Sequence, residues 1–212
     1  MGAHPLTLVL QGVALFAFVP FVLWLLLAQP LGPGWSLALG VAIIAGHRVV
    51  AAPWAARHAM RRCLWCGRPG QQAGAVPVSS GRPTTAFAVC CGAHERLARQ
   101  FFGFVDGHRV AIGLGIVAPL MLLLAGTLLR ALGVASLAHG ANALQFRVFV
   151  AATVVFVSFV YRASAPAEQP RSPFPVHNLF LLGIRNTLWV FRIVGGWWLL
   201  DAALKVGGYR LG

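Results

Sequence analysis

Uninterrupted apolar runs, each long enough to cross a membrane, leave this chain few possible folds. A helix needs about 20 apolar residues to cross a hydrocarbon layer about 30 Å thick. Four runs reach this length with almost no charged residue, at residues 6–28, 35–56, 110–129 and 141–161. Because 58% of the 212 residues are hydrophobic and only 10% are charged, a soluble fold could not bury so much apolar surface. The sequence therefore predicts an all-α integral membrane protein.

A fifth apolar segment, residues 178–200, carries polar residues that leave its position open. Asn178, Arg185 and Arg192 recur every seven residues, so a helix would place them on one stripe. An arginine at the centre of a bilayer costs about 2.5–3.5 kcal/mol on insertion scales, and less near the surface. Three interpretations of this stripe are open. Its arginines extend to the lipid headgroups from an interfacial helix, they dock on an acidic partner subunit, or they bind an anionic lipid, cofactor or substrate. We therefore predict four to five transmembrane helices.

Basic residues distinguish the two sides of the membrane. Residues 57–109 contain eight arginines, whereas the connection 29–34 contains no basic residue and 130–140 contains one. Because basic loops remain in the cytoplasm, we expect the amino terminus and residues 57–109 on the cytoplasmic side of a bacterial inner membrane. The first apolar run lacks the basic flank and the cleavage site of a signal peptide, so we expect it to be retained. The net charge of +13 comes from arginines that flank the spans and meet anionic lipids, so we expect no nucleic-acid partner.

All cysteines of the chain lie in the predicted cytoplasmic loop, with a histidine close behind them: Cys63, Cys66, Cys90, Cys91 and His94. A reducing compartment favours metal or redox chemistry over structural disulfides. The first two cysteines stand in the pattern Cys-x-x-Cys-Gly, which is typical of a zinc knuckle, a turn in which two thiolates bind one ion. Unligated thiols and a redox dithiol are the alternatives to a metal site.

The residues between and after the two cysteine pairs complete a recognisable pattern. Residues 75–78 and 84–89 are β-prone and flank a turn at Gly81, and residues 93–104 have a helical pattern. A knuckle, a hairpin and two ligands at a helix start resemble a treble-clef zinc finger, over residues 63–104 only. The resemblance implies one structural Zn²⁺, and the preferred ligands are Cys63, Cys66, Cys91 and His94, with Cys90 as the alternative to Cys91.

Other chemistry finds little support among the residues of the spans. The first four spans contain no acidic residue, which argues against proton or ion transport. His47 has no partner histidine at the same depth, so we do not expect haem. The loop contains only Glu95 and Asp106 as acids, which favours a structural zinc ion over a catalytic one.

The composition divides the chain into five parts. These are two transmembrane helices (1–56), a cytoplasmic zinc-finger-like loop with a short hairpin and a helix (57–109), two further transmembrane helices (110–162), a Pro/Ser-rich linker (163–176), and a membrane-embedded or interfacial helix with the tail (177–212). We expect a non-catalytic membrane subunit that scaffolds or docks onto a larger membrane complex, with other membrane subunits and anionic lipids as partners. A membrane enzyme for a lipid or quinone-like substrate, and a metal- or redox-responsive regulator, are the alternatives.

Overall fold

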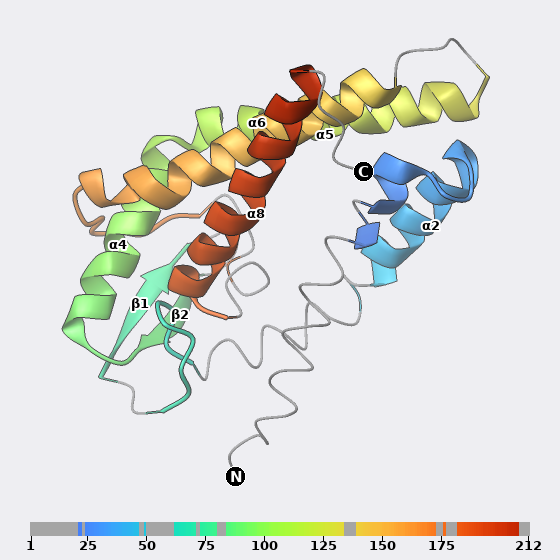
Figure 1. Cartoon of the computed structure of the whole chain (residues 1–212). Coiled ribbons are helices and arrows are strands. Elements are labelled where there is room, and N and C mark those ends of the chain that lie inside the picture. Colours follow the sequence, from blue (N-terminus) through green and yellow to red (C-terminus); the bar gives the residue numbers. More distant parts are fainter. Residues whose placement is uncertain are drawn as a thin grey trace.

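The structure of the chain is a computed structural model that describes residues 21–22, 24–46, 49, 62–70, 73–79, 84–133, 139–172, 176 and 182–207. Three long helices dominate it: α5 (Arg109–Ala131), α6 (His139–Val160) and α8 (Ile184–Val206) (Figure 1). Each has 22 or 23 residues, or about 33–35 Å at 1.5 Å per residue, and each is long and apolar enough to span a membrane.

The outward faces of these helices are apolar, as the faces of membrane helices are. Leu114 on α5, Phe149 on α6 and Ile193 on α8 leave 63%, 51% and 67% of their surface exposed. Because soluble proteins rarely leave such large apolar side chains exposed on every long helix, lipid is the solvent that fits these surfaces. The prediction of a helical membrane protein agrees with these three candidate spans.

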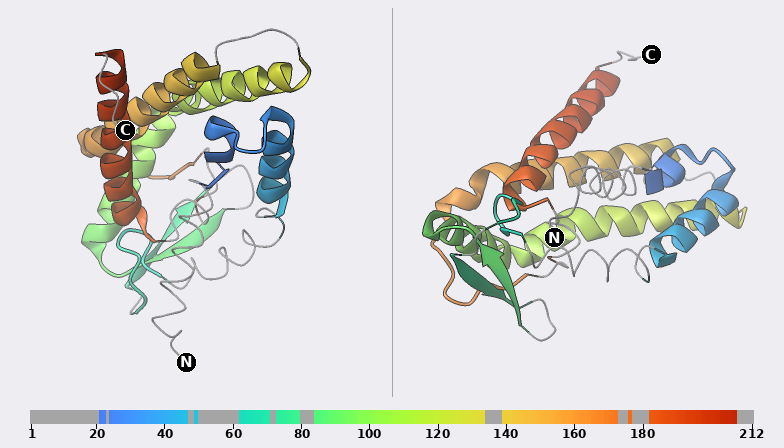
Figure 2. Two further views of the ribbon diagram at one scale, coloured as in Figure 1. Left: turned by 45° about the vertical axis from the view of Figure 1, so that its right-hand side comes forward. Right: turned by 90° about the horizontal axis from the view of Figure 1, so that it is seen from below.

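The first predicted span lies largely outside the described residues, and the second is described only in part. Within the second of them, the structure describes α2 (Pro33–Gly46), whose 14 residues are too few to cross a bilayer by themselves. The helix α2 packs against α5, where Gly34 lies next to Ala131. Figure 2 shows α2 toward the end of α5 and α6 that lies farthest from the hairpin.

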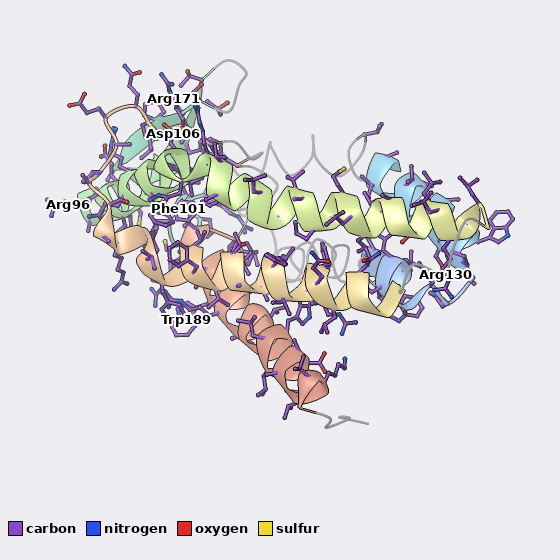
Figure 3. The ribbon with its side chains drawn as sticks, turned by 90° about the horizontal axis from the view of Figure 1, so that it is seen from above. Arg96, Phe101, Asp106, Arg130, Arg171 and Trp189 are labelled. Carbon is purple, nitrogen blue, oxygen red and sulfur yellow. The ribbon has the colours of Figure 1, made fainter. Side chains whose placement is uncertain are left out.

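Small residues let the three long helices approach closely. Figure 3 shows α5 and α6 side by side, with α8 crossing α6 at an angle. A side chain at Gly195 of α8 would place its Cβ 2.7 Å from Val155 of α6, so the glycine is required for this crossing. On the other side of α6, Gly115 of α5 faces Thr153 in the same way. The helix α8 ends six residues later than the predicted segment 178–200. It also begins six residues later, because Gly183 has a positive φ of 88° that a helix cannot contain.

The loop between α2 and α5 contains a small folded module whose apolar core also includes residues from the ends of α5, α6 and α8. Its strands β1 (Gly74–Val78) and β2 (Thr85–Val89) pair antiparallel, with Val76 opposite Phe87, and α4 (Gly92–Gly107) packs on them (Figure 1). These strands and this helix lie where the sequence predicts them, while the expected turn at Gly81 lies outside the described residues. Only His108 separates α4 from α5, so the module is fixed at the start of a candidate membrane span.

The segment predicted as a linker is extended but docked on this module. Ser79, at the end of β1, donates its backbone N–H to Pro170, and Ser172 donates to the carbonyl of Ser79. The guanidinium of Arg99 on α4 donates to the carbonyls of Ala167 and Glu168. The chain that leaves α6 therefore crosses the module before it reaches α8.

Candidate metal centre

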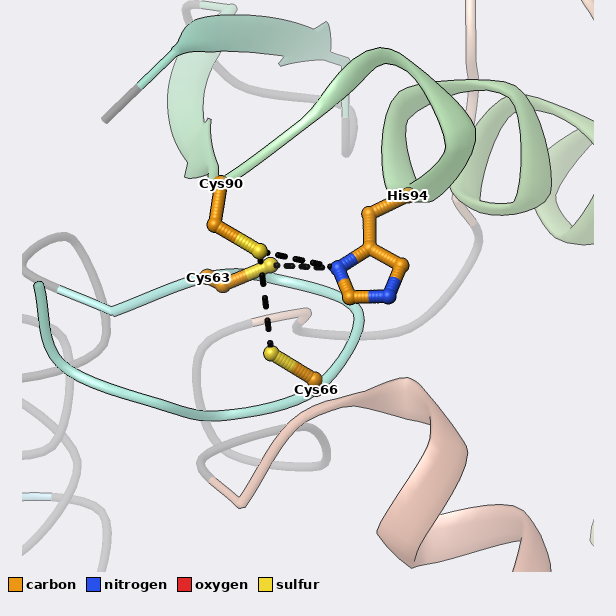
Figure 4. A group of neighbouring side chains, drawn as sticks. All are labelled: Cys63, Cys66, Cys90 and His94. Atoms are coloured by element: carbon orange, nitrogen blue, oxygen red, sulfur yellow. Dashed lines mark hydrogen bonds between the residues drawn. The ribbon is translucent and has the colours of Figure 1, made fainter. Parts of the chain in front are cut away.

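The knuckle, residues 62–70, is a tight turn that presents two thiols to one side (Figure 4). The N–H of Gly67 donates to the carbonyl of Cys63, and the N–H of Cys63 donates to the carbonyl of Arg68. Gly67 has a positive φ of 72°, a backbone conformation that glycine adopts at no steric cost. The N–H of Leu64 donates to Ala88 of β2, which fixes the knuckle beside the hairpin.

Four side chains of this region converge on one point, namely Cys63, Cys66, Cys90 and His94. Their sulfur atoms and one ring nitrogen lie within 4.8 Å of one another. The sulfurs of Cys66 and Cys90 are 3.9 Å apart, and the sulfur of Cys63 is 3.6 Å from Nδ1 of His94.

These distances can be compared with those in a zinc tetrahedron. Bonds of 2.3 Å to sulfur and 2.0–2.1 Å to nitrogen place neighbouring ligand atoms about 3.8 Å apart for two sulfurs and about 3.6 Å apart for sulfur and nitrogen. The pairs Cys66–Cys90 and Cys63–His94 match these values. The sulfur of Cys90 lies only 2.9 Å from Nδ1 of His94, a hydrogen-bond distance that a shared ion would lengthen. Three thiols and one imidazole are a standard donor set for structural zinc, so the residues present fit this metal.

The cluster contains the alternative ligand of the sequence analysis in place of the preferred one. Cys90 belongs to the cluster, and Cys91 does not. The backbone of Cys91 is extended, with φ −165° and ψ 163°, and neighbouring side chains of extended chain point to opposite sides. Cys91 instead precedes the first residue of α4 and accepts backbone hydrogen bonds from His94 and Glu95. The first turn of α4 brings the ring of His94 back beside the thiol of Cys90, which lies four residues earlier in the sequence.

The thiols of the cluster have unequal affinities for protons. Burial, together with hydrogen bonds and negative charge from Cys63 and Cys66, raises the pKa of Cys90 to about 12. Burial also acts to raise the pKa of Cys63, but backbone hydrogen bonds from Cys66, Cys90 and Trp65 outweigh it and lower this pKa to about 6. Neighbouring thiolates repel one another, so a bound divalent cation is what allows all of them to ionise together.

The acids of the module do not belong to the cluster. Glu95 lies next to His94 in sequence, but its carboxylate pairs with Arg99 at 2.9 Å. No carboxylate of the described residues joins the four clustered ligands. A closed set of four protein ligands leaves no open position for a substrate, in contrast to a catalytic zinc site.

The knuckle caps α8, a candidate membrane span, and this is a contact that sequence reasoning missed. The first N–H groups of a helix lack partners within it. Here the N–H of Ile184 donates to the carbonyl of Leu64, and that of Arg185 donates to the carbonyl of Trp65, both at 2.9 Å. The Cys-x-x-Cys turn therefore supplies the acceptors at the start of α8.

Two glycines allow this contact between backbones. A Cβ at Gly183 would lie 2.7 Å from the carbonyl carbon of Cys66 and would also meet the N–H of Gly67. A Cβ at Gly67 would meet the carbonyl of Leu182. The only signal in the sequence is a glycine directly after the Cys-x-x-Cys turn and another directly before α8, and it does not say that the two meet.

The predicted arginine stripe lies next to the knuckle. Arg185 and Arg192 border a pocket of about 340 Å³ that is also lined by His94 and by Arg162, an arginine that the sequence analysis did not assign to any site. Asn178, the third predicted member of the stripe, lies outside the described residues, as does His47.

Arg192 is held among polar and aromatic groups. Its guanidinium donates to the hydroxyl and the carbonyl of Ser158 and lies over the rings of Phe159 and Trp189, with 4.3 Å and 5.0 Å to their centroids. Cation–π contact and neutral acceptors lower the cost of this charge near the membrane, but they leave the charge itself uncompensated.

Comparison of the chain with protein-family models, with curated proteins and with solved structures finds no match. The functional conclusion therefore depends on the geometry of the cluster, of the knuckle and of the pocket.

Proposed function

We propose that this protein is a non-catalytic membrane subunit whose cytoplasmic module is held together by one structural zinc ion and scaffolds a larger membrane complex. The observation that carries the proposal is the contact of the knuckle with α8. The knuckle provides two thiols to the cluster and two carbonyls to the start of a candidate membrane span. Zinc binding thereby stabilises not only the module but also the position of α8.

A structural role for zinc follows from the size of the module. A two-stranded sheet with one helix buries too little apolar surface to fold by itself without a staple. In such modules the free energy of metal binding is the free energy of folding. The four ligands come from the knuckle, from the end of β2 and from the first turn of α4, so a single ion joins all parts of the module.

The positions of the helix ends support a cytoplasmic location for the module. The start of α5 and the start of α8 both lie beside it, and Tyr161 at the end of α6 packs into its core. The three candidate spans therefore have the module, with its many arginines, at the same end. A cytoplasmic side is the one that the positive-inside rule assigns to such a surface.

The metal is tested by the zinc content of purified protein. We expect about one zinc per chain in the wild type, as a closed four-ligand site implies. Cys66→Ser should lose the zinc and expose the module to protease, while Cys91→Ser is the matched control and should retain both zinc and protection. A wild-type protein that is folded and free of zinc would contradict the proposal, as would equal zinc loss in both variants.

The scaffold role is tested in the native membrane. After extraction in a mild detergent, chemical crosslinking and mass spectrometry should find a membrane protein at a constant ratio to the wild-type chain. The ratio should fall for Cys66→Ser and remain for Cys91→Ser, because only the first variant disturbs the knuckle under α8. A wild-type chain that purifies without a stoichiometric partner would refute this role and leave the structural zinc site intact.

A further inference from the structure

The pocket beside the knuckle gathers positive charge from two different membrane helices. Arg162 lies two residues after the end of α6, whereas Arg185 and Arg192 belong to the first half of α8. The end of α6 lies beside the start of α8 in space. The three arginines therefore line one pocket at the end of the helices that is nearest the module. Aromatic residues complete the walls, among them Trp65, Tyr161 and Trp189.

Most donor groups of these arginines are unused. A guanidinium has five N–H groups. Arg192 uses Nε and Nη2 on Ser158, and Arg162 uses Nε on the hydroxyl of Tyr161. In the part of the chain that the structure describes, the guanidinium of Arg185 has no hydrogen bond or ion pair, and 185 is an exposed position. The pocket therefore offers several N–H donors to a ligand.

The chain cannot neutralise this charge by itself. The chain contains only four acidic residues, and the structure describes all of them: Glu95, Asp106, Glu168 and Asp201. Glu95 pairs with Arg99, and Asp201 pairs with Arg147 and Lys205 at a different level of the bundle. None of the four acids lines the pocket. Three positive charges within one small volume therefore repel one another until an anion binds.

We propose that this pocket binds the phosphate group of a phosphate monoester. A phosphate monoester carries close to two negative charges at neutral pH, and its oxygens match the planar fork of a guanidinium. Arg185 also stands on the first turn of α8, where the helix dipole favours a negative charge. This proposal does not depend on the scaffold role, because it concerns a ligand and not a partner chain.

Two sources can supply such a group, a lipid headgroup or a soluble phosphate compound. If α6 and α8 span the membrane, the end of α6 and the start of α8 lie at the depth of the lipid headgroups. Trp189, beside the pocket, is 52% exposed. Indoles prefer this depth, and anionic lipids are enriched in the cytoplasmic leaflet. These features favour a lipid such as phosphatidic acid.

Binding is measured on the full-length, zinc-loaded protein in neutral detergent, by a method that reports affinity directly. Three probes separate the sources: short-chain phosphatidic acid, glycerol 3-phosphate and short-chain diacylglycerol, which has no phosphate. We expect Arg185→Gln and Arg162→Gln each to weaken phosphatidic acid binding about ten-fold or more, the effect of one lost charge-assisted bond. The matched control is Arg96→Gln, which removes an exposed arginine of α4 outside the pocket (Figure 3).

The affinities of the three probes and of the variants test the proposal and identify the source of the phosphate group. Tighter binding of phosphatidic acid than of glycerol 3-phosphate identifies the lipid as the source, and equal affinities identify a soluble phosphate compound. The proposal is overturned if diacylglycerol binds as tightly as phosphatidic acid, or if Arg185→Gln and Arg96→Gln have the same effect. Zinc content and thermal unfolding of every variant show that the module is folded, so that a loss of binding reports on the pocket.

Discussion

Replacing Gly183 by alanine should separate the knuckle from α8, for two physical reasons. The first is conformational, because Gly183 has φ 88° and ψ 149°, a region that other residues occupy only at a cost of about 1–3 kcal/mol. The second is steric, because the new Cβ would lie 2.7 Å from the carbonyl carbon of Cys66 and 2.8 Å from the carbonyl oxygen of Trp65. Both groups belong to the backbone and cannot rotate away, so the knuckle must shift.

A shift of the knuckle weakens the two backbone hydrogen bonds at the start of α8. They join Ile184 to Leu64 and Arg185 to Trp65. Each such bond contributes about 0.5–1.5 kcal/mol net, so with the conformational cost the free energy of unfolding should fall by about 2–6 kcal/mol.

The assay is unfolding of the zinc-loaded protein by SDS in mixed micelles, combined with hydrogen exchange of the amides at the start of α8. Gly196→Ala is the matched control, since it lies on the same helix and its Cβ would meet nothing within 4 Å. Its stability should change by no more than about 1 kcal/mol, the difference in helix propensity. Equal stability of the two variants, with unchanged exchange at Ile184 and Arg185, would refute the reasoning that the glycine joins knuckle and helix.

Three further predictions concern the metal, the packing of α6 and α8, and the topology. Lowering the pH should release zinc cooperatively, because protons compete with the metal for three thiols and one imidazole; zinc content that stays constant down to pH 4 would contradict this ligand set. Asp201→Asn should weaken the contact of α8 with α6 by about 1.5–3 kcal/mol through the loss of its 3.2 Å pair with Arg147, while Lys205→Met, whose side chain is 42% exposed, should change the SDS midpoint little. In a Cys91→Ser variant, cysteine-reactive reporter groups placed at Ala73 and at Leu132 should be accessible to a labelling reagent from opposite sides of the membrane. Labelling of both positions from the same side would show that α5 does not cross it.

Much of the fold follows from local properties of the sequence. The apolar runs that became α5 and α6 are recognisable because a bilayer demands a fixed length of uncharged helix, whatever the helix packs against. The strands near 75–78 and 84–89 follow from β-prone residues, and the helix after the second cysteine pair follows from its periodic pattern. The boundary of α8 was less accessible, because Gly183 is compatible with a helix until its close contact with the knuckle gives it a positive φ.

The candidate site shows where local reasoning ends. Sequence spacing brought Cys63, Cys66 and His94 together, because a knuckle and a helix start each determine the direction of their own side chains. The choice between Cys90 and Cys91 depends instead on which face of the extended chain after β2 turns toward the knuckle. The pairing of β2 with β1 determines that face. In the sequence the two adjacent cysteines are equivalent, so the sequence does not indicate which of them faces the knuckle.

The same holds for the contacts between parts that are distant in the sequence. The knuckle carbonyls and the first amides of α8 are separated by about 120 residues, and neither carries a side-chain pattern, since backbone groups are the same in every residue. Arg162 joins Arg185 and Arg192 only because the end of α6 and the start of α8 both lie beside the module. The apolar spans and the chemistry of the ligands follow from local sequence. Which thiol enters the cluster, what caps α8 and which arginines share a pocket depend on the relative placement of distant elements, and no local propensity encodes that placement.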